Sequence, residues 1–161
     1  MKDCFLKLNK LSADDMVKIS KITLDSVQKT EWEMSFGSSE IYWKKDMQFI
    51  FDLILPESLK QYVDGQYMSV IPPFTTMEHH TDLHRDALIY LPIHPIKEDY
   101  KSLIYYHNDE QIRIDNYDIG QVYLCNTKIV HSVNNNIKLP RYCYQISLNG
   151  KSYEDLLSKI T

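Results

Sequence analysis

The stretch EHHTDLHRDALIYLPI, residues 78–93, places three histidines and two aspartates directly before the apolar run ALIYLPI. An apolar run of this length, with an isoleucine and a tyrosine among its leucines, predicts a buried strand. The polar half has two interpretations. It is either a loop that happens to be rich in histidine, or one half of a metal site whose other half lies further along the chain.

Residues 66–149 consist of short runs rich in valine, isoleucine, tyrosine and threonine, separated by turn residues. Eight such runs predict eight strands: 66–73, 75–82, 86–93, 101–107, 110–117, 120–126, 128–133 and 141–148. No helical pattern separates them, which favours an antiparallel sandwich or barrel over alternating strands and helices. We therefore expect a mainly β, cupin-like jelly roll (a double-stranded β-helix), with Pro72 and Pro73 at an edge or bend and Gly120 in a turn.

The flanking segments predict supporting helices. Residues 12–28 begin with a capping Ser12 and carry an apolar face that includes Met16, Val17 and Leu24. Residues 56–63 open with proline and residues 152–160 with a capping serine, so both predict short helices. The clusters EIYW and QFIF, between residues 30 and 55, favour extended structure. We expect one domain over 1–161, with N-terminal support over 1–65, the β core over 66–149 and a C-terminal helix over 150–161.

Composition excludes several classes of protein. The 161 residues carry 18 basic and 22 acidic side chains, a formal net charge of −4, with the two signs interspersed. This balance gives no reason to expect a nucleic-acid partner. No apolar run approaches the roughly 20 residues that cross a bilayer, and the first residues lack the apolar core of a signal peptide. Three cysteines without a paired motif fit a reducing compartment, so we expect a cytoplasmic protein that binds no membrane.

Three residues of the core have the types and spacing of a metal site. His80 and Asp82 are separated by one residue, and His131 lies within the seventh predicted strand. Two histidines and one carboxylate on one face of an octahedral ion leave three positions open, enough for a bidentate cosubstrate and dioxygen. His84 and Asp86 form a rival pair, but Asp86 adjoins the strand itself, so we favour His80 and Asp82.

Arg141 adds an anion-binding group. It lies at the start of the eighth predicted strand, just after the turn NNNIKLP that follows the strand of His131. Across such a turn the two residues are expected on neighbouring strands that face the same interior. A buried guanidinium beside a metal binds a carboxylate in a bidentate manner and stays charged at physiological pH.

Together these residues resemble the iron(II)- and 2-oxoglutarate-dependent oxygenases, whose signature is H-x-D, a distal H and a following R on a double-stranded β-helix. The resemblance runs from about residue 67 to 148 and is carried by HTDLHRDALIYLPI and NTKIVHSVNNNIKLPR. It implies the cofactor Fe(II) and the cosubstrates 2-oxoglutarate and O2. It also implies hydroxylation of a C–H bond with release of succinate and CO2.

The resemblance also assigns roles to residues. His80, Asp82 and His131 would be the iron ligands and catalytic centre, and Arg141 would pair with the distal carboxylate of 2-oxoglutarate. Some members carry a serine two residues after the arginine, where this chain has Cys143, a weak donor. Other candidates for contact with the cosubstrate are Tyr90, Tyr67 and Asn126.

The substrate is open at this stage. A peptidyl or small-molecule substrate is expected, by analogy with a slight preference for a peptide. Arg85 is either a surface charge or a substrate contact, as is His84, while His79 should point away from the metal. The alternatives are a cupin-like protein that binds a metal or ligand without oxygen chemistry, and an oxoglutarate-independent dioxygenase or isomerase. An oligomer is possible through the strand-like N-terminal segments.

Overall fold

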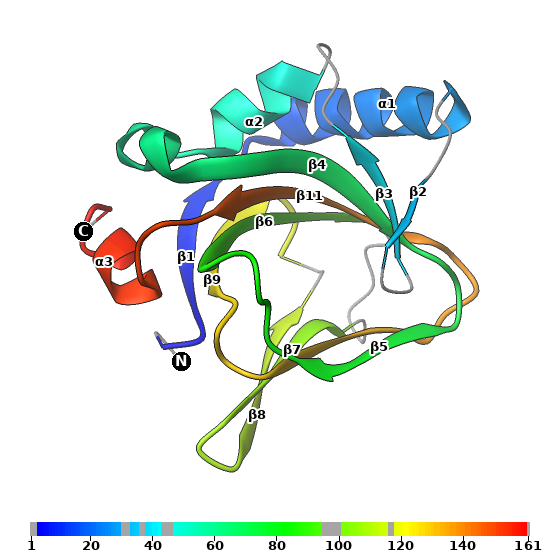
Figure 1. Ribbon diagram of the computed structural model, residues 1–161. Coiled ribbons are helices and arrows are strands. Elements are labelled where there is room, and N and C mark those ends of the chain that lie inside the picture. The colour runs from blue at the N-terminus through cyan, green and yellow to red at the C-terminus, as the bar shows by residue number, and fades with distance from the viewer. Residues whose placement is uncertain are drawn as a thin grey trace.

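Two antiparallel sheets pack face to face in the computed structural model of the chain, which describes residues 3–29, 33–35, 38–42, 47–94, 101–115 and 118–160 (Figure 1). The larger sheet has seven strands in the order β1-β9-β6-β11-β4-β3-β2, and the smaller has the order β5-β10-β7-β8. The strands are β1 (Phe5–Lys10), β2 (Glu33–Ser35), β3 (Ser38–Tyr42), β4 (Val63–Ile71), β5 (Thr75–His80), β6 (Ala87–His94), β7 (Lys101–His107), β8 (Glu110–Asp115), β9 (Gln121–Asn126), β10 (His131–Asn135) and β11 (Arg141–Leu148). The expected mainly β jelly roll is confirmed.

The larger sheet is buried on both faces, and β11 shows how its residues divide between them. Tyr144, Ile146 and Leu148 belong to the core that lies under the helices. Cys143 belongs to the second core, between the two sheets. Because side chains alternate along a strand, Arg141 and Gln145 share the inner face with Cys143.

Helices cover the outer face of the larger sheet. α1 (Ala13–Lys29) and α2 (Gln48–Ile54) lie across it, η2 (Glu57–Tyr62) is a 3-10 helix, and α3 (Tyr153–Leu157) follows the last strand (Figure 1). The side chains of Ser12 and Ser152 cap α1 and α3, accepting hydrogen bonds at 3.1 Å from the amides three residues later. Both predicted caps are therefore present.

α1 packs through a different face from the one its apolar residues predicted. Met16, Ile19 and Thr23 are buried, whereas Val17 is 72% and Leu24 is 55% exposed. The Thr23 hydroxyl lies 3.0 Å from that of Tyr144, and Phe51 of α2 meets the same tyrosine ring edge-on. The Thr23 hydroxyl also donates to the Ile19 carbonyl at 2.8 Å, so it accepts from Tyr144, and the buried phenol thereby has a partner.

Most predicted strands are present, with two errors outside the core. QFIF lies in α2 rather than in a strand, because Ile50, Phe51 and Ile54 have helical spacing and are buried against the outer face of the larger sheet. β1 was not predicted; it is the outermost strand of the larger sheet and pairs with β9. β3 covers most of EIYW, whose Trp43 lies outside the described residues.

The expected pairing of the strands that carry His131 and Arg141 is wrong. β10 pairs with β5 and β7 in the smaller sheet, whereas β11 lies between β6 and β4 in the larger one. The connection between them crosses from one sheet to the other. The buried Asn135 fixes this crossing, because its amide nitrogen lies 2.9 Å from the carbonyl oxygens of Ile71, Pro72 and Leu139.

In the parts of the chain that the structure describes, every helix is too short or too polar to cross a bilayer.

Gly120 is in the predicted turn before β9, with a φ of +78° that favours glycine. Its carbonyl accepts a hydrogen bond from the Leu11 amide at 2.9 Å, and a Cβ there would lie 3.0 Å from the Leu11 carbonyl oxygen. Gly150 has a similar φ of +84°, but a Cβ would meet nothing within 4 Å. The two glycines thus share a backbone conformation and differ in available space.

Gly120→Ala should therefore lower the free energy of unfolding by about 2 to 3 kcal/mol, and Gly150→Ala by only about 1 kcal/mol. Urea unfolding of both variants at 25 °C measures the difference. Equal losses would show that the close approach to Leu11 relaxes without cost.

Candidate metal centre

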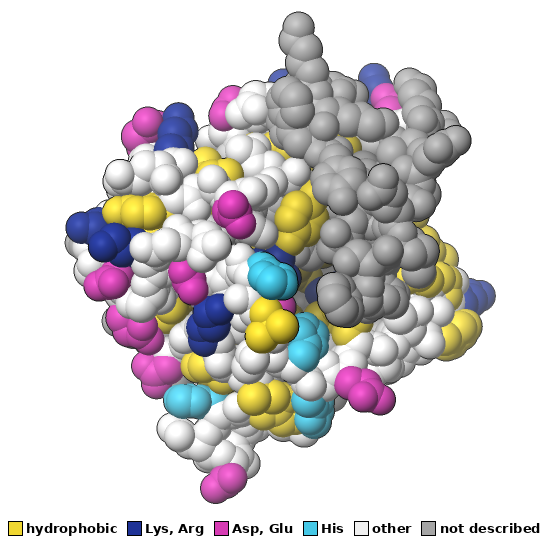
Figure 2. Space-filling model, in the orientation of Figure 1, with side chains coloured by type: hydrophobic (Ala, Val, Ile, Leu, Met, Phe, Trp, Pro, Cys, Tyr) yellow, Lys and Arg dark blue, Asp and Glu magenta, His cyan; other side chains and the backbone are white. Residues whose placement is uncertain are grey.

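Three potential metal ligands lie at the ends of two paired strands and in the loop between the sheets. His80 is the last residue of β5, His131 is the first of β10, and the two are directly opposite in the antiparallel ladder. Asp82 follows in the loop, where its amide donates to the Thr127 carbonyl at 2.9 Å. Figure 2 shows histidine side chains gathered around a recess on one face of the molecule.

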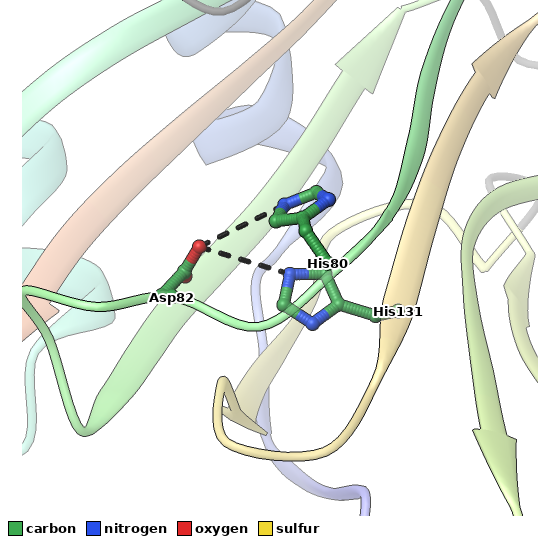
Figure 3. Close-up of side chains that lie close together, drawn as sticks. All are labelled: His80, Asp82 and His131. Atoms are coloured by element: carbon green, nitrogen blue, oxygen red, sulfur yellow. Dashed lines mark ion pairs between the residues drawn. The ribbon is translucent and has the colours of Figure 1, made fainter.

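The ligand atoms of these three residues all lie within 4.8 Å of one another (Figure 3). Asp82 Oδ1 is 3.7 Å from His80 Nε2 and 3.9 Å from His131 Nε2, and the two imidazole rings are 4.5 Å apart. Two ligands bound at about 2 Å each are at most about 4 Å apart, so one ion fits between the carboxylate and either ring. The structure brings the three predicted ligands together.

The hydrogen bonds of both imidazoles fit metal ligation. His80 Nδ1 lies 2.6 Å from the Glu78 carbonyl oxygen, and His131 Nδ1 lies 2.9 Å from that of Ile129. A carbonyl only accepts, so Nδ1 of each ring donates the proton of this bond, and Nε2 is the ring nitrogen directed toward Asp82. Ligating histidines are usually held in this way.

Burial also favours the ligating form of His131. Removal of this imidazole from water lowers its pKa, although the Ile129 carbonyl and Asp82 oppose the shift. The ring is therefore neutral at pH 7, as a metal ligand must be.

The rival pair, His84 and Asp86, is used differently. Asp86 Oδ2 accepts a hydrogen bond from the Gly150 amide at 2.9 Å, and its Oδ1 lies 3.6 Å from Lys128 Nζ. His84 is exposed. Asp86 thus joins the loop to the segment after β11, and the pair lies outside the cluster of ligand atoms found among the described residues. The His79 ring contacts that of Tyr106 in a tilted arrangement, with ring centroids 3.9 Å apart, on the outer face of the smaller sheet.

Arg141 is buried on the inner face of the larger sheet. Its exposed fraction is 1%, and an Nη atom donates a hydrogen bond to the Tyr90 hydroxyl on the neighbouring strand β6. A guanidinium held in this way can bind a carboxylate through the N–H groups along its planar edge. Arg141, the predicted anchor, and Tyr90, another predicted cosubstrate contact, therefore lie together.

Two other candidates for cosubstrate contact have structural partners. Asn126 donates to the Asp3 carbonyl and accepts from the Lys128 amide, both at 3.0 Å, so its amide fixes the turn after β9. Tyr67 accepts a hydrogen bond from Arg85, and its hydroxyl also lies 3.2 Å from that of Ser147.

Sequence reasoning assigned no role to two residues that contact this region. Gln145 accepts a hydrogen bond from Arg85 at 3.1 Å, and Lys128 Nζ donates to the Asp82 carbonyl at 3.0 Å. The alternation along β11 places Gln145 on the inner face, which gave a signal for it. Lys128 had no comparable signal, because its contact depends on how the loop folds back.

No protein-family model and no curated protein sequence matches the chain. Solved structures do match. A prolyl hydroxylase from Trichoplax adhaerens, in complex with a hypoxia inducible factor peptide fragment, superposes with a TM-score of 0.75 at 13% identity, over 94% of this chain and 86% of that one. A Pseudomonas putida prolyl-4-hydroxylase superposes with a TM-score of 0.64 at 10% identity, over 91% of this chain and 93% of that one. A Burkholderia pseudomallei oxidoreductase of the 2OG-Fe(II) oxygenase family gives 0.65 at 8% identity, over 94% and 88%.

The chain has the fold of the 2OG-Fe(II) oxygenases. At identities this low the likeness concerns the fold alone. It extends over nearly the whole chain, including the helices that cover the larger sheet. The expected resemblance is thus present at the level of the fold, and the chemistry depends on the site described above.

Replacing each acidic residue of the two H-x-D pairs separates the two assignments. Asp82→Ala should weaken Co(II) binding by more than about 100-fold, because it removes a ligand rather than a residue that supports one. Asp86→Ala should bind Co(II) like the wild type while losing stability. Anaerobic titration followed by visible absorption measures both, and loss of binding in Asp86→Ala alone would reverse the assignment.

Proposed function

We propose that the protein is an Fe(II)- and 2-oxoglutarate-dependent dioxygenase that hydroxylates a C–H bond of a peptidyl or small-molecule substrate, releasing succinate and CO2. One observation carries the proposal. His80, Asp82 and His131 converge at one edge of the space between the sheets, and Arg141 is buried on the wall of the same space. This occurs on the fold of the 2OG-Fe(II) oxygenases.

The chain would hold iron through His80 Nε2, His131 Nε2 and Asp82 Oδ1. Bound iron supplies the redox chemistry that couples oxidative decarboxylation of 2-oxoglutarate to substrate oxidation. The protein's own contribution is to present two imidazoles and one carboxylate on a single side, which leaves the opposite side accessible. The hydrogen bonds from Nδ1 to the strand backbone keep the rings in this orientation.

Arg141 and Tyr90 would bind the distal carboxylate of 2-oxoglutarate. The guanidinium supplies a permanent charge and the phenol a further donor, and both are at most 2% exposed. A charge-assisted hydrogen bond is stronger in such a dry setting than at a surface. Cys143, two residues after the arginine, is also buried on this face, but its thiol donates only weakly.

An apolar or peptidyl substrate is supported by the residues beside the ligands. Leu83 follows Asp82 and is 83% exposed, and Val130 precedes His131 and is 41% exposed. Both side chains adjoin a candidate metal ligand in sequence, so an apolar group of a bound substrate could pack on them. The Trichoplax adhaerens structure holds a peptide fragment, which supports the same class for this chain. The three cysteines are free and buried, which suits a reducing, cytoplasmic setting.

The cosubstrate can be tested by spectroscopy. Anaerobic protein with Fe(II) and 2-oxoglutarate should give the broad visible charge-transfer band of the chelate. Arg141→Ala should raise the Kd for 2-oxoglutarate by about 100-fold, because the variant leaves a carboxylate without its buried partner. Arg113→Ala, which changes an exposed arginine of β8, is the control and should leave the Kd unchanged.

Absence of the band in the wild type would contradict the proposal and favour a cupin-like metal-binding protein without oxygen chemistry. Full persistence after Arg141→Ala would contradict the anchor role alone.

Turnover tests the reaction class directly. With Fe(II), 2-oxoglutarate and O2, a panel of prolyl peptides, asparaginyl peptides and free amino acids should include at least one compound that stimulates succinate formation. Mass spectrometry of that compound should show a gain of one oxygen atom. Stimulation without oxygen incorporation would exclude hydroxylation as the outcome.

A further inference from the structure

Arg85 forms hydrogen bonds to Asp82, a candidate metal ligand, and to side chains on the inner face of the larger sheet. Its Nε donates to Asp82 Oδ2 at 2.5 Å, and one Nη donates to the Tyr67 hydroxyl and, at 3.1 Å, to Gln145 Oε1. Its backbone carbonyl accepts from Thr127 Oγ1 at 2.9 Å. These contacts fix both ends of the residue.

The partners of Arg85 are themselves held. Gln145 Nε2 lies 3.1 Å from Ser69 Oγ and 3.4 Å from Cys143 Sγ. A network of side-chain hydrogen bonds therefore runs from the Asp82 carboxylate, through Arg85 and Gln145, to the strand that begins with Arg141. Side chains linked in such a network have fewer rotamers available than isolated ones.

The two oxygens of Asp82 have different partners. Oδ2 faces Arg85, whereas Oδ1 faces the Nε2 atoms of His80 and His131. Asp82 lies in a loop, so no strand ladder restricts its side chain. The contact with Arg85 thus determines which oxygen is presented to an ion and leaves the other one occupied.

We infer that Arg85 is a positioning residue that holds Asp82 as a one-oxygen ligand, and this role rests on the proposed function of the site. The guanidinium orients the carboxylate through Oδ2 and anchors it to Tyr67 and Gln145. The metal-binding half of the site is thereby connected to the wall that carries Arg141. A role in binding a substrate carboxylate would require Arg85 to leave these partners.

The sign of the effect on metal affinity distinguishes positioning from simple electrostatics. A guanidinium beside a cation site repels the cation, so loss of its charge alone would tighten metal binding. Loss of an orienting hydrogen bond weakens it, typically by 10- to 100-fold for a residue that supports a ligand. Arg85→Met removes both the charge and the hydrogen bonds while keeping much of the length.

Lys128→Met is the matched control. Lys128, in the turn between β9 and β10, donates through Nζ to the backbone carbonyl of Asp82 and lies near Asp86. It places a positive charge beside the loop of Arg85 without bonding the Asp82 carboxylate. Its removal should change the metal Kd by less than about threefold, or tighten binding. Tyr67→Phe keeps the ring and removes the hydroxyl that accepts from Arg85.

The experiment is an anaerobic titration of the 161-residue chain with Co(II), without 2-oxoglutarate, followed by visible d–d absorption. We expect Arg85→Met to raise the Kd about 10- to 100-fold and to change the shape of the absorption bands, since Asp82 is freed to bind through both oxygens. Arg85→Lys should recover part of the affinity, because an ammonium donates to the carboxylate but lacks the planar fork. Tyr67→Phe should raise the Kd less than Arg85→Met does.

Equal or tighter binding by Arg85→Met, or an equal loss in Lys128→Met, would overturn the inference. Circular dichroism without metal checks that each variant is folded, and if Arg85→Met is not, Arg85→Lys and Tyr67→Phe still decide. In that case unchanged Kd and band shape in both would overturn it. Failure of the wild type to bind Co(II) would instead count against the proposed function.

Discussion

The register between β5 and β10 is the constraint on which the site depends. It places His80 and His131 directly opposite each other at the end of a two-strand ladder, so their imidazoles lie on one face at short separation. A shift of one residue would turn one ring to the outer face of the sheet, because side chains alternate along a strand. The crossing between β10 and β11, held by Asn135, then returns the chain to the larger sheet, where Arg141 faces the same interior.

The two cores have different tasks. The core beneath α1 and α2 is mainly apolar, with the buried Thr23 and Ser26 of α1 beside it, and it stabilises the larger sheet from outside. The core between the sheets mixes aromatic residues with thiols and borders the polar side chains of β4, β6 and β11. Because the helices already bury the outer face of the larger sheet in an apolar core, its inner face can carry polar groups. Such groups are costly to bury unless they are hydrogen-bonded.

Sequence patterns predicted the inner structure better than the periphery. The eight strands, the His80–Asp82 pair and the inward direction of Arg141 follow from spacing and alternation, which are local properties. That His131 would join this pair was expected only from the resemblance to a known family. The exposed face of α1 and the helix at QFIF do not, since burial against the sheet decides both. The pairing of β10 with β5 rather than with β11 depends on a crossing that no short stretch encodes. The bonds of Arg85 depend on a side-chain conformation and on strands distant in sequence.

The backbone carbonyls that hold both imidazoles have a consequence for how an ion enters. Each ring already carries its proton on the nitrogen that faces its own strand, two residues back. An arriving ion therefore meets Nε2 of both rings already directed toward Asp82, and neither imidazole has to rotate before it binds.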